Sequence, residues 1–352
     1  MHVKRVIKYF AGYTIPLATG LSIYFGGIWS FITPVYAFIL LPFLELLIPA
    51  NNKNLSDVEE ELVKKDKVYD WILYLHVPIQ YAMLYYFLYT VTYSPLQGYE
   101  LVGLILSMGT CCGVIGINVA HELGHRKSKS EQFLAKMLLL TSLYMHFIIE
   151  HNKGHHKNVS TNQDPSSARL NEPLYFFYFR TITGTIASAW HIQLTELKNA
   201  GHSFLSWQNE LLIFQIVQVV FLASIAWIFG ITTMFIFIPA AFVGILLLEA
   251  VNYIEHYGLR RKKATSGLYE RVQPWHSWNS NHVIGRVVLY ELTRHSDHHY
   301  MASRKYQILR HTDTAPQLPA GYPAMILLSL IPPLYFRVMN PMITIIERQY
   351  KT

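Results

Sequence analysis

The chain has 352 residues, of which 52% are hydrophobic and only 14% charged, and its formal net charge is +7. Soluble proteins carry about a quarter charged residues, so this composition excludes an ordinary soluble protein and indicates a membrane protein. The two cysteines, Cys111 and Cys112, are neighbours in an apolar run, so we expect no disulfide framework, CxxC zinc site or fused iron–thiolate domain within this chain.

Six apolar stretches are each long enough to cross the roughly 30 Å hydrocarbon core of a bilayer as an α-helix. They lie near residues 7–26, 28–49, 70–93, 98–120, 210–229 and 231–254. The first has no small-residue cleavage site, so we interpret it as a span and not as a signal peptide. Turn residues near 26, 94–98 and 230 join the stretches in pairs. The sequence therefore predicts an all-α integral membrane protein of six transmembrane helices, forming one domain over 1–352.

The positive charges predict how these helices are oriented. None of the 29 lysines and arginines lies in the three short connections; they lie near the N-terminus and after the second, fourth and sixth spans. This is the positive-inside distribution, so we expect both termini and the segments 121–209 and 255–352 on the cytoplasmic side. Topology and contact with membrane lipid account for the charge, and no nucleic-acid partner is expected.

Histidines are concentrated at the predicted cytoplasmic helix ends. Of 17 histidines, nine fall in four clusters, in the sequences HELGHRK, EHNKGHHKN, NYIEHYGL and ELTRHSDHHY. The nine are His121, His125, His151, His155, His156, His256, His295, His298 and His299. Because each cluster lies at or beyond a cytoplasmic helix end, topology brings all four to one side of the membrane.

The spacing within the clusters is typical of metal ligands. His121 and His125 are four residues apart and so project from one face of a helix. The same spacing recurs in two further pairs, His151 with His155 and His295 with His299. Imidazole binds iron, zinc, copper and nickel, and one ion takes about four to six ligands, so nine histidines suit two ions. Four interspersed carboxylates are candidates to orient the ligating rings from the outer side: Glu122, Glu150, Glu255 and Asp297.

Two other interpretations of the histidines fit the sequence less well. HELGH matches the HExxH pattern of zinc proteases, in which Glu122 would be the general base. Such a site needs one ion and three protein ligands, so the further clusters argue against it. A metal transporter would carry ionisable residues at mid-membrane depth, whereas the predicted spans are almost free of charge. His76 and His146 lie in apolar surroundings typical of structural histidines.

A pair of nitrogen-bound iron ions at a membrane face predicts an oxidative reaction. Reduced iron in such a site can activate dioxygen for attack on an unactivated C–H bond, which side chains cannot perform, while the protein positions the substrate. The location suits a substrate dissolved in lipid.

The motifs resemble those of a known family. HELGH, EHNKGHH, NYIEHYGL, HSWNSN and RHSDHH, in this order, resemble the bacterial membrane alkane 1-monooxygenases, within the wider superfamily of histidine-box membrane desaturases and hydroxylases. The resemblance extends to LPFLELLIP at 41–49, to NQDPSSAR after the second cluster and to 318–341. It therefore covers nearly the whole chain, and NYIEHYGL and HSWNSN are its most specific parts.

The resemblance implies six transmembrane helices under a cytoplasmic cap, in the bacterial inner membrane, with two iron ions held by the nine histidines. The implied reaction is terminal hydroxylation of a medium- or long-chain n-alkane to a 1-alkanol with dioxygen. The implied electron donor is a separate rubredoxin, reduced by rubredoxin reductase. A fatty-acyl desaturase, a fatty-acid hydroxylase or a methyl-arene monooxygenase remains the alternative within the superfamily.

Three positions depart from the family's usual pattern. Thr293 and Tyr300 flank the last cluster, and Arg126 follows His125 where lysine is usual. None removes a predicted ligand, but Tyr300 beside His299 bears on substrate range and on the donor's docking surface. The basic run 260–263 either docks an acidic donor or anchors the chain at the membrane.

Overall fold

The computed structural model describes residues 2–350, with side chains from residue 5 onward. No β-strand occurs within 2–350, where the only pairings of the β type are isolated bridges between Lys263 and Tyr269 and between Asn279 and Gln317. The prediction of an all-α protein is therefore confirmed.

Helical segments follow one another along the whole described chain. The N-terminal part contains α1 (His2–Ile7), η1 (Lys8–Tyr13), α2 (Thr14–Phe25), η2 (Gly27–Phe31), α3 (Ile32–Val35), η3 (Tyr36–Leu40), α4 (Leu41–Leu47), α5 (Asp57–Lys65), α6 (Val68–Tyr74) and α7 (His76–Tyr93). The middle part contains α8 (Gly98–Cys111), η4 (Cys112–Ile117), α9 (Asn118–Gly124), α10 (Lys129–Leu140), α11 (Phe147–Glu150), η5 (His151–His155), α12 (His156–Asn158) and α13 (Leu174–Asn199). The C-terminal part contains α14 (Glu210–Phe229), α15 (Ile231–His256), η6 (Pro274–His276), α16 (Val283–Val288), α17 (His295–Tyr300), η7 (Tyr306–Ile308), α18 (Tyr322–Ser329) and α19 (Pro332–Tyr350).

Four helical runs in the described residues are long and apolar enough to cross a membrane, as expected for a membrane protein. They are Gly27–Leu47, Gly98–Gly124, Glu210–Phe229 and Ile231–His256. These runs correspond to four of the six predicted spans. The other two, 7–26 and 70–93, are also helical, in η1–α2 and α6–α7, but are not among these four.

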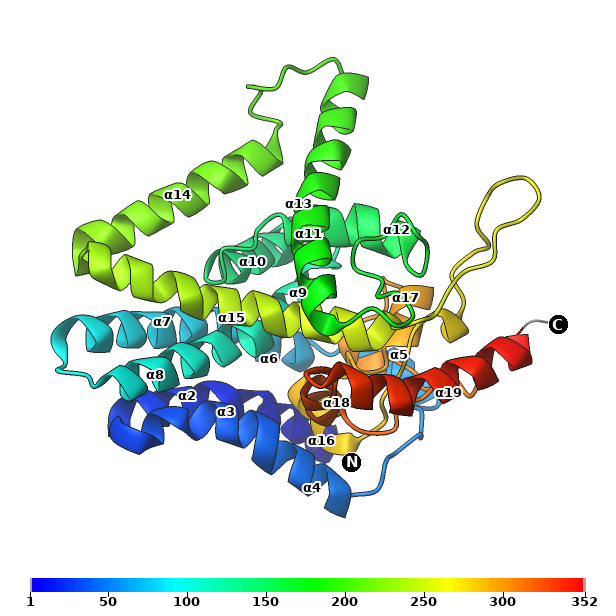
Figure 1. The fold of residues 1–352 in the computed structure, drawn as a ribbon, viewed down its shortest axis with the longest axis horizontal. Helices are drawn as coiled ribbons and strands as arrows, with labels where there is room; N and C mark the ends of the chain where they lie inside the picture. The colour runs from blue at the N-terminus through cyan, green and yellow to red at the C-terminus, as the bar shows by residue number, and fades with distance from the viewer. Residues whose placement is uncertain (1, 351–352) are drawn as a thin grey trace.

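Glycines make the reversals between paired helices. Gly26 and Gly27 have φ of +58° and +51°, and Gly230 has φ of +92°, a region that residues with a side chain rarely adopt. The chain turns at these points as the sequence predicts, so α14 and α15 form a hairpin beside that of α7 with α8, and the latter lies in turn beside the hairpin of α2 with α3 and α4 (Figure 1).

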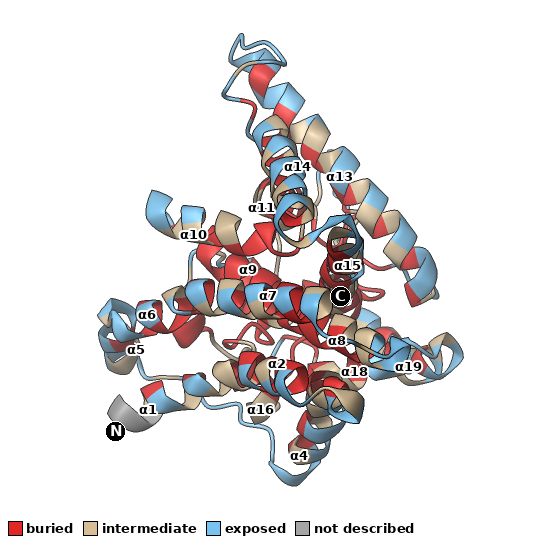
Figure 2. Ribbon diagram, turned by 90° about the vertical axis from the view of Figure 1, so that its left-hand side faces the viewer, coloured by how far each residue is buried: buried red, intermediate tan, exposed pale blue. Residues whose placement is uncertain are grey.

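Close packing of α8–η4 against α15 forms the centre of the molecule. A Cβ atom on Gly109 would lie 2.4 Å from the Val243 side chain, and one on Gly244 would lie 2.8 Å from Cys112 Cβ. Small residues at both faces therefore let the two backbones approach closely. Figure 2 shows buried residues concentrated along α8, α9 and α15, while α13 and α14 are largely exposed on their outer side. This contact fixes the relative positions of the two helix ends that carry His121 and His256.

Candidate metal centre

The nine predicted histidines meet at one end of the helical bundle, and they form two groups. His121 lies on α9 and His125 just after it, His151 and His155 on η5, His156 on α12, His256 at the end of α15, and His295, His298 and His299 on α17. Seven of the rings are buried, while His125 and His156 are half-buried.

The first group contains five rings, which come from three of the four clusters in the sequence. It consists of His121, His125, His151, His156 and His298, whose ligand atoms lie within 4.8 Å of one another. The Nε2 atoms of His121 and His298 are 2.9 Å apart. The Nε2 atom of His151 lies 3.1 Å from that of His125 and 3.1 Å from that of His156.

The second group contains the remaining four rings, all buried: His155, His256, His295 and His299. Its Nε2 atoms are 3.2 Å apart between His155 and His299, and 3.1 Å apart between His295 and His256. Because η5–α12 and α17 each contribute to both groups, the two groups are neighbours.

A π-helical turn divides the second histidine cluster between the groups. Residues 151–155 form a π-helix, in which the His156 N–H bonds to the carbonyl of His151, five residues back. The wider turn brings His151 and His156 together, and it directs His155 into the other group. The α-helical spacing predicted that His151 and His155 would share a face, and this prediction was wrong, since the local helix has a different period. Single π-turns of this kind occur often at functional sites.

The arrangement of the ring nitrogens fits two metal ions. A neutral imidazole has one N–H, yet Nε2 of His151 faces two other ring nitrogens. Burial lowers the pKa of His151 and of His298 well below the ordinary range, so added protons do not satisfy these contacts. Metal–nitrogen bonds of about 2.1 Å place ligand nitrogens at right angles about 3 Å apart, which matches the observed spacing.

Asp164, which the sequence patterns did not indicate, orients one of the nine rings. Its Oδ2 atom lies 2.9 Å from Nδ1 of His155 and accepts a hydrogen bond from Ser167 Oγ, while its Oδ1 atom accepts one from the Ser166 N–H. Burial opposes the charged form of both groups, but their mutual attraction outweighs it, so the pKa of His155 is raised and that of Asp164 is lowered. The bond leaves Nε2 of His155 free for the second group. The available signal was an aspartate in NQDPSSAR, nine residues after His155.

Of the four predicted carboxylates, Glu255 directly contacts one of the nine histidines in the described part of the chain. Its Oε2 atom lies 3.1 Å from Nε2 of His295, and its Oε1 atom accepts a hydrogen bond of 2.8 Å from Tyr322 OH. Nε2 of His295 is also the atom that faces His256. Glu255 therefore reaches into the second group and does not hold the ring from its outer side.

Glu122 belongs to a buried network of ion pairs. It pairs with Arg126 at 2.6 Å and accepts a hydrogen bond of 3.1 Å from the Tyr306 N–H. Arg126 also bonds Asp70 at 3.1 Å, and Lys305 bonds Asp70 at 2.8 Å. The network ties α6 and the first histidine cluster to the segment that follows the last cluster.

Asp297 and Glu150 likewise bind partners other than the nine rings. Asp297 pairs with Arg304 at 2.6 Å, and Glu150 accepts a hydrogen bond of 3.2 Å from Ser188 Oγ. Within the described residues, the Nδ1 atoms of His295, His298 and His299 are buried and have no hydrogen-bond partner. No side chain therefore orients these three rings through Nδ1. The other described histidines, His76 and His146 among them, lie outside both groups.

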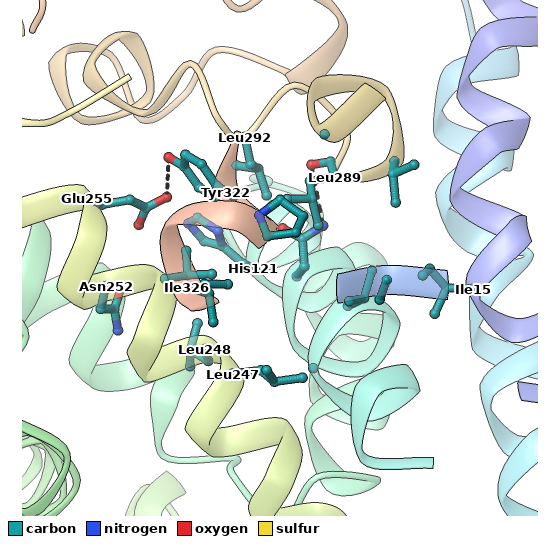
Figure 3. Close-up of a pocket in the computed structure, with 18 of the residues that line it drawn as sticks. Ile15, His121, Leu247, Leu248, Asn252, Glu255, Leu289, Leu292, Tyr322 and Ile326 are labelled. Atoms are coloured by element: carbon teal, nitrogen blue, oxygen red, sulfur yellow. Dashed lines mark hydrogen bonds between the residues drawn. The ribbon is translucent and has the colours of Figure 1, made fainter. Parts of the chain in front are cut away.

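An apolar cavity ends at the histidines. Its walls come from η3 and α4, η4, α15, α16 and α18. His121 and Glu255 line one end of the cavity, and Leu247 and Leu248 lie toward the other (Figure 3). Two metal ions at the end of such a cavity can act on a hydrocarbon chain held by nonpolar contact.

The chain is similar in sequence to known enzymes of one family. The family model of the fatty acid desaturases matches residues 98–329, a range that contains all nine histidines. The chain is 40% identical over 307 residues to the alkane 1-monooxygenase of Acinetobacter baylyi, covering 87% of this chain and 75% of that protein. It is 38% identical over 327 residues to the alkane 1-monooxygenase of Pseudomonas putida, covering 92% and 79%.

The chain is more distantly similar to an enzyme with a different name. The chain is 25% identical over 349 residues to the hydroxylase component of the xylene/toluene monooxygenase of Pseudomonas putida, covering 97% of this chain and 90% of that protein.

Proposed function

This chain belongs to the alkane 1-monooxygenases, within the fatty acid desaturase family, and from this premise we propose that it hydroxylates the terminal methyl group of medium- and long-chain n-alkanes. It is a membrane oxidoreductase, and the proposed product is a 1-alkanol. The observation that carries the proposal is the pair of all-histidine groups at the end of an apolar cavity.

The metal ions proposed for the two groups are iron. Zinc has no redox chemistry, whereas hydroxylation with dioxygen requires a redox-active metal, and imidazole suits iron. When bound, the iron pair supplies the reduction of dioxygen, the co-substrate, and the oxidation of an unactivated C–H bond. The nine histidines hold the ions, and Asp164 fixes the orientation of His155.

Glu255 is proposed as an additional donor to the second group. Its Oε2 atom is as close to Nε2 of His295 as Nε2 of His256 is. With this oxygen the second group would have five donors, equal to the five rings of the first. The hydrogen bond from Tyr322 holds the other carboxylate oxygen and so fixes the direction of Oε2.

The cavity is proposed to select the terminal carbon of the substrate. Its lining is mostly apolar, with side chains such as Phe38, Leu248, Val288 and Ile326, so transfer of an alkane from water becomes more favourable with every buried CH₂. A narrow cavity that ends at the metal centre presents the end of an extended chain first. The same walls exclude water from the reacting carbon.

The membrane arrangement proposed is the predicted one, with six spans and both termini, 121–209 and 255–352 on the cytoplasmic side of the bacterial inner membrane. The distribution of lysine and arginine supports this orientation. The helices at 7–26 and 70–93 would supply the two further spans, since they lie beside the apolar runs.

A separate rubredoxin, reduced by rubredoxin reductase, is proposed as the electron donor. The half-buried rings of His125 and His156 are the metal-binding side chains nearest to solvent, and Lys127 and Lys157 next to them are exposed. Tyr300, beside His299, is also exposed, with the Arg271 guanidinium 5.8 Å from its ring centre. This basic surface suits an acidic partner.

In the basic run 260–263, the two arginines form hydrogen bonds within the protein. Arg260 donates hydrogen bonds to the carbonyls of Leu259 and Ala168, and Arg261 donates to those of Lys157 and Glu270. These two arginines hold neighbouring backbone, so docking would depend on the exposed lysines, both those at 262 and 263 and those near the half-buried histidines.

A methyl-arene monooxygenase is the second candidate, because of the similarity to the xylene/toluene enzyme. The two candidates are separated by product analysis. The chain is expressed with a rubredoxin and its reductase in a host that cannot oxidise alkanes, and n-octane, n-hexadecane, toluene and palmitate are supplied in turn. The proposal expects 1-octanol and 1-hexadecanol as the main products. Benzyl alcohol or an oxidised acyl chain as the sole product, with metal-loaded protein, would overturn it.

A further inference from the structure

A carboxylate that the proposed reaction does not use is buried beside the cavity. Glu45 lies on α4 within the membrane-spanning run Gly27–Leu47, and only 5% of its surface is exposed. Its Oε1 atom accepts a hydrogen bond of 2.8 Å from the Gly285 N–H, while Oε2 has no hydrogen-bond partner among the described residues. An ionisable group buried at such a place is costly, so its presence requires an explanation.

Two glycines leave the space that this carboxylate fills. A Cβ atom on Gly321 would lie 1.9 Å from Oε2 of Glu45, and one on Gly285 would lie 2.7 Å from Oε1. Gly321 has φ of −68°, and Gly285 lies within α16, so neither backbone conformation requires glycine. Glycine inside a helix is destabilising relative to alanine. The need to admit the Glu45 side chain therefore accounts for both glycines.

Glu45 joins three walls of the cavity at one point. On α4 it lies one turn after Leu41, on the same face of the helix, and Leu41 lines the cavity. Gly285 lines the cavity from α16, and Gly321 immediately precedes α18, whose first residue, Tyr322, also lines it. The three elements belong to different parts of the sequence, and the carboxylate lies between them.

The point of contact lies near the reacting end of the cavity. Tyr322 donates its hydroxyl to Glu255, and Glu255 lies 3.1 Å from the ligand nitrogen of His295 (Figure 3). A displacement at the start of α18 would therefore move the cavity wall that adjoins the second histidine group.

We propose that Glu45 is a positioning residue that holds the beginnings of α16 and α18 against α4 and so fixes the width of the cavity beside the metal centre. At this width the end of an extended alkane reaches the centre with its methyl group. A wider cavity lets the chain bend, so that its second carbon also reaches the centre. This inference rests on the proposed alkane hydroxylation and adds a determinant of its regioselectivity.

The functional test compares Glu45→Leu with Glu45→Gln. Leucine removes the acceptor for the Gly285 N–H, whereas glutamine keeps both the acceptor and the size of the side chain. In full-length protein supplied with rubredoxin, rubredoxin reductase and n-octane, Glu45→Leu should raise the fraction of 2-octanol several-fold and lower the octanol formed per dioxygen consumed. The iron content should equal that of wild type, because Glu45 belongs to neither histidine group. Glu45→Gln should restore the wild-type product ratio.

The contact between Glu45 and Gly321 is tested by making one residue smaller and the other larger. Gly321→Ala places a methyl group against Oε2, and Glu45→Asp shortens the carboxylate and leaves a gap. Each single variant should raise the 2-octanol fraction and lower the unfolding temperature. The double variant Glu45→Asp/Gly321→Ala should be closer to wild type in both measurements than either single variant, because neighbouring residues couple.

Two results would overturn the inference. The first is that Glu45→Leu gives the same fraction of 2-octanol as wild type and the same amount of octanol per dioxygen consumed. The second is loss of iron in Glu45→Leu, which would assign Glu45 to support of the metal centre and not to the substrate. Failure of the proposed function would give a different result, because wild type itself would then form no octanol. The variants Glu45→Asp and Gly321→Ala would still lower the unfolding temperature, and the double variant would still restore it in part.

Discussion

His155 and Asp164 form a buried hydrogen bond of 2.9 Å between Nδ1 and Oδ2, which turns the other ring nitrogen of His155 toward His299. Asp164→Asn should lower metal affinity at the second group by about 10- to 100-fold, the usual effect of losing such a partner. Iron retained per chain after dialysis against a chelator measures this change.

The pair of His311 and Asp313, with its 3.0 Å contact, supplies the matched control for Asp164, because neither residue belongs to the two histidine groups. Asp313→Asn removes a similar bond from an exposed carboxylate and should leave iron retention unchanged. Equal iron retention in Asp164→Asn and wild type would show that the bond does not support the metal centre.

Glu255→Gln should weaken one of the two iron sites and leave the other intact, because Glu255 contacts only a ring of the second group. Mössbauer spectra of protein loaded with ⁵⁷Fe should show a change in one iron signal. Glu249 provides the control, since it is buried on the same helix and accepts hydrogen bonds only from neutral groups, Tyr144, Thr181 and Asn252. Identical spectra in Glu255→Gln and Glu249→Gln would contradict a donor role for Glu255.

The metal-free protein should lose stability on acidification through the pKa of its buried histidines. Burial lowers the pKa of His156 to about 3, while in the unfolded chain it is about 6.5. As pH falls below about 6.5 the unfolded chain therefore binds a proton that the folded chain does not, and the free energy of unfolding decreases. Burial raises the pKa of Glu150 to about 8, which acts in the opposite sense.

His156→Asn isolates the contribution of the ring at position 156. Between about pH 7.5 and about pH 5.5, the unfolding temperature of the metal-free protein should fall less in this variant than in wild type. An equal or larger fall in the variant would contradict the low pKa of His156.

Leu247→Phe should shift substrate preference toward shorter alkanes. Leu247 lines the part of the cavity away from the histidines, opposite Gly113, so a larger side chain shortens the space for the far end of the substrate. The measured quantity is the ratio of product from n-hexadecane to product from n-octane, which should decrease. Val220→Phe, on the exposed side of α14, should leave the ratio unchanged. An unchanged ratio in Leu247→Phe would place the substrate elsewhere.

The nine histidines that the sequence singled out do come together in the structure, because helices space residues of one type at short, recognisable intervals; that they bind metal stays a prediction. It did not predict how the rings are divided. That division depends on the π-helical turn at 151–155, and local sequence patterns based on the α-helical period do not reveal such a turn. His155 was therefore expected beside His151 and lies in the other group.

Residues whose roles arise from tertiary contact were the hardest to predict. Asp164 becomes a partner of His155 through the loop after α12, and Glu45 meets Gly285 and Gly321 from segments about 240 residues and more away in sequence. Glu122 and Asp297 alternate with ligands in the sequence, yet both pair with arginines. Adjacency to the histidines in the sequence identified candidate carboxylates. The fold determines which side chain each carboxylate contacts.

The most direct test of the account is the fate of labelled oxygen. Purified protein with two irons per chain receives electrons from rubredoxin and rubredoxin reductase, and is supplied with n-octane and ¹⁸O₂. We expect 1-octanol carrying ¹⁸O from wild type, and none from His298→Ala, which lacks a ring of the first histidine group. Unlabelled 1-octanol, or the same labelled yield from His298→Ala, would contradict the claim that the histidine groups hold the oxygen-activating metal centre.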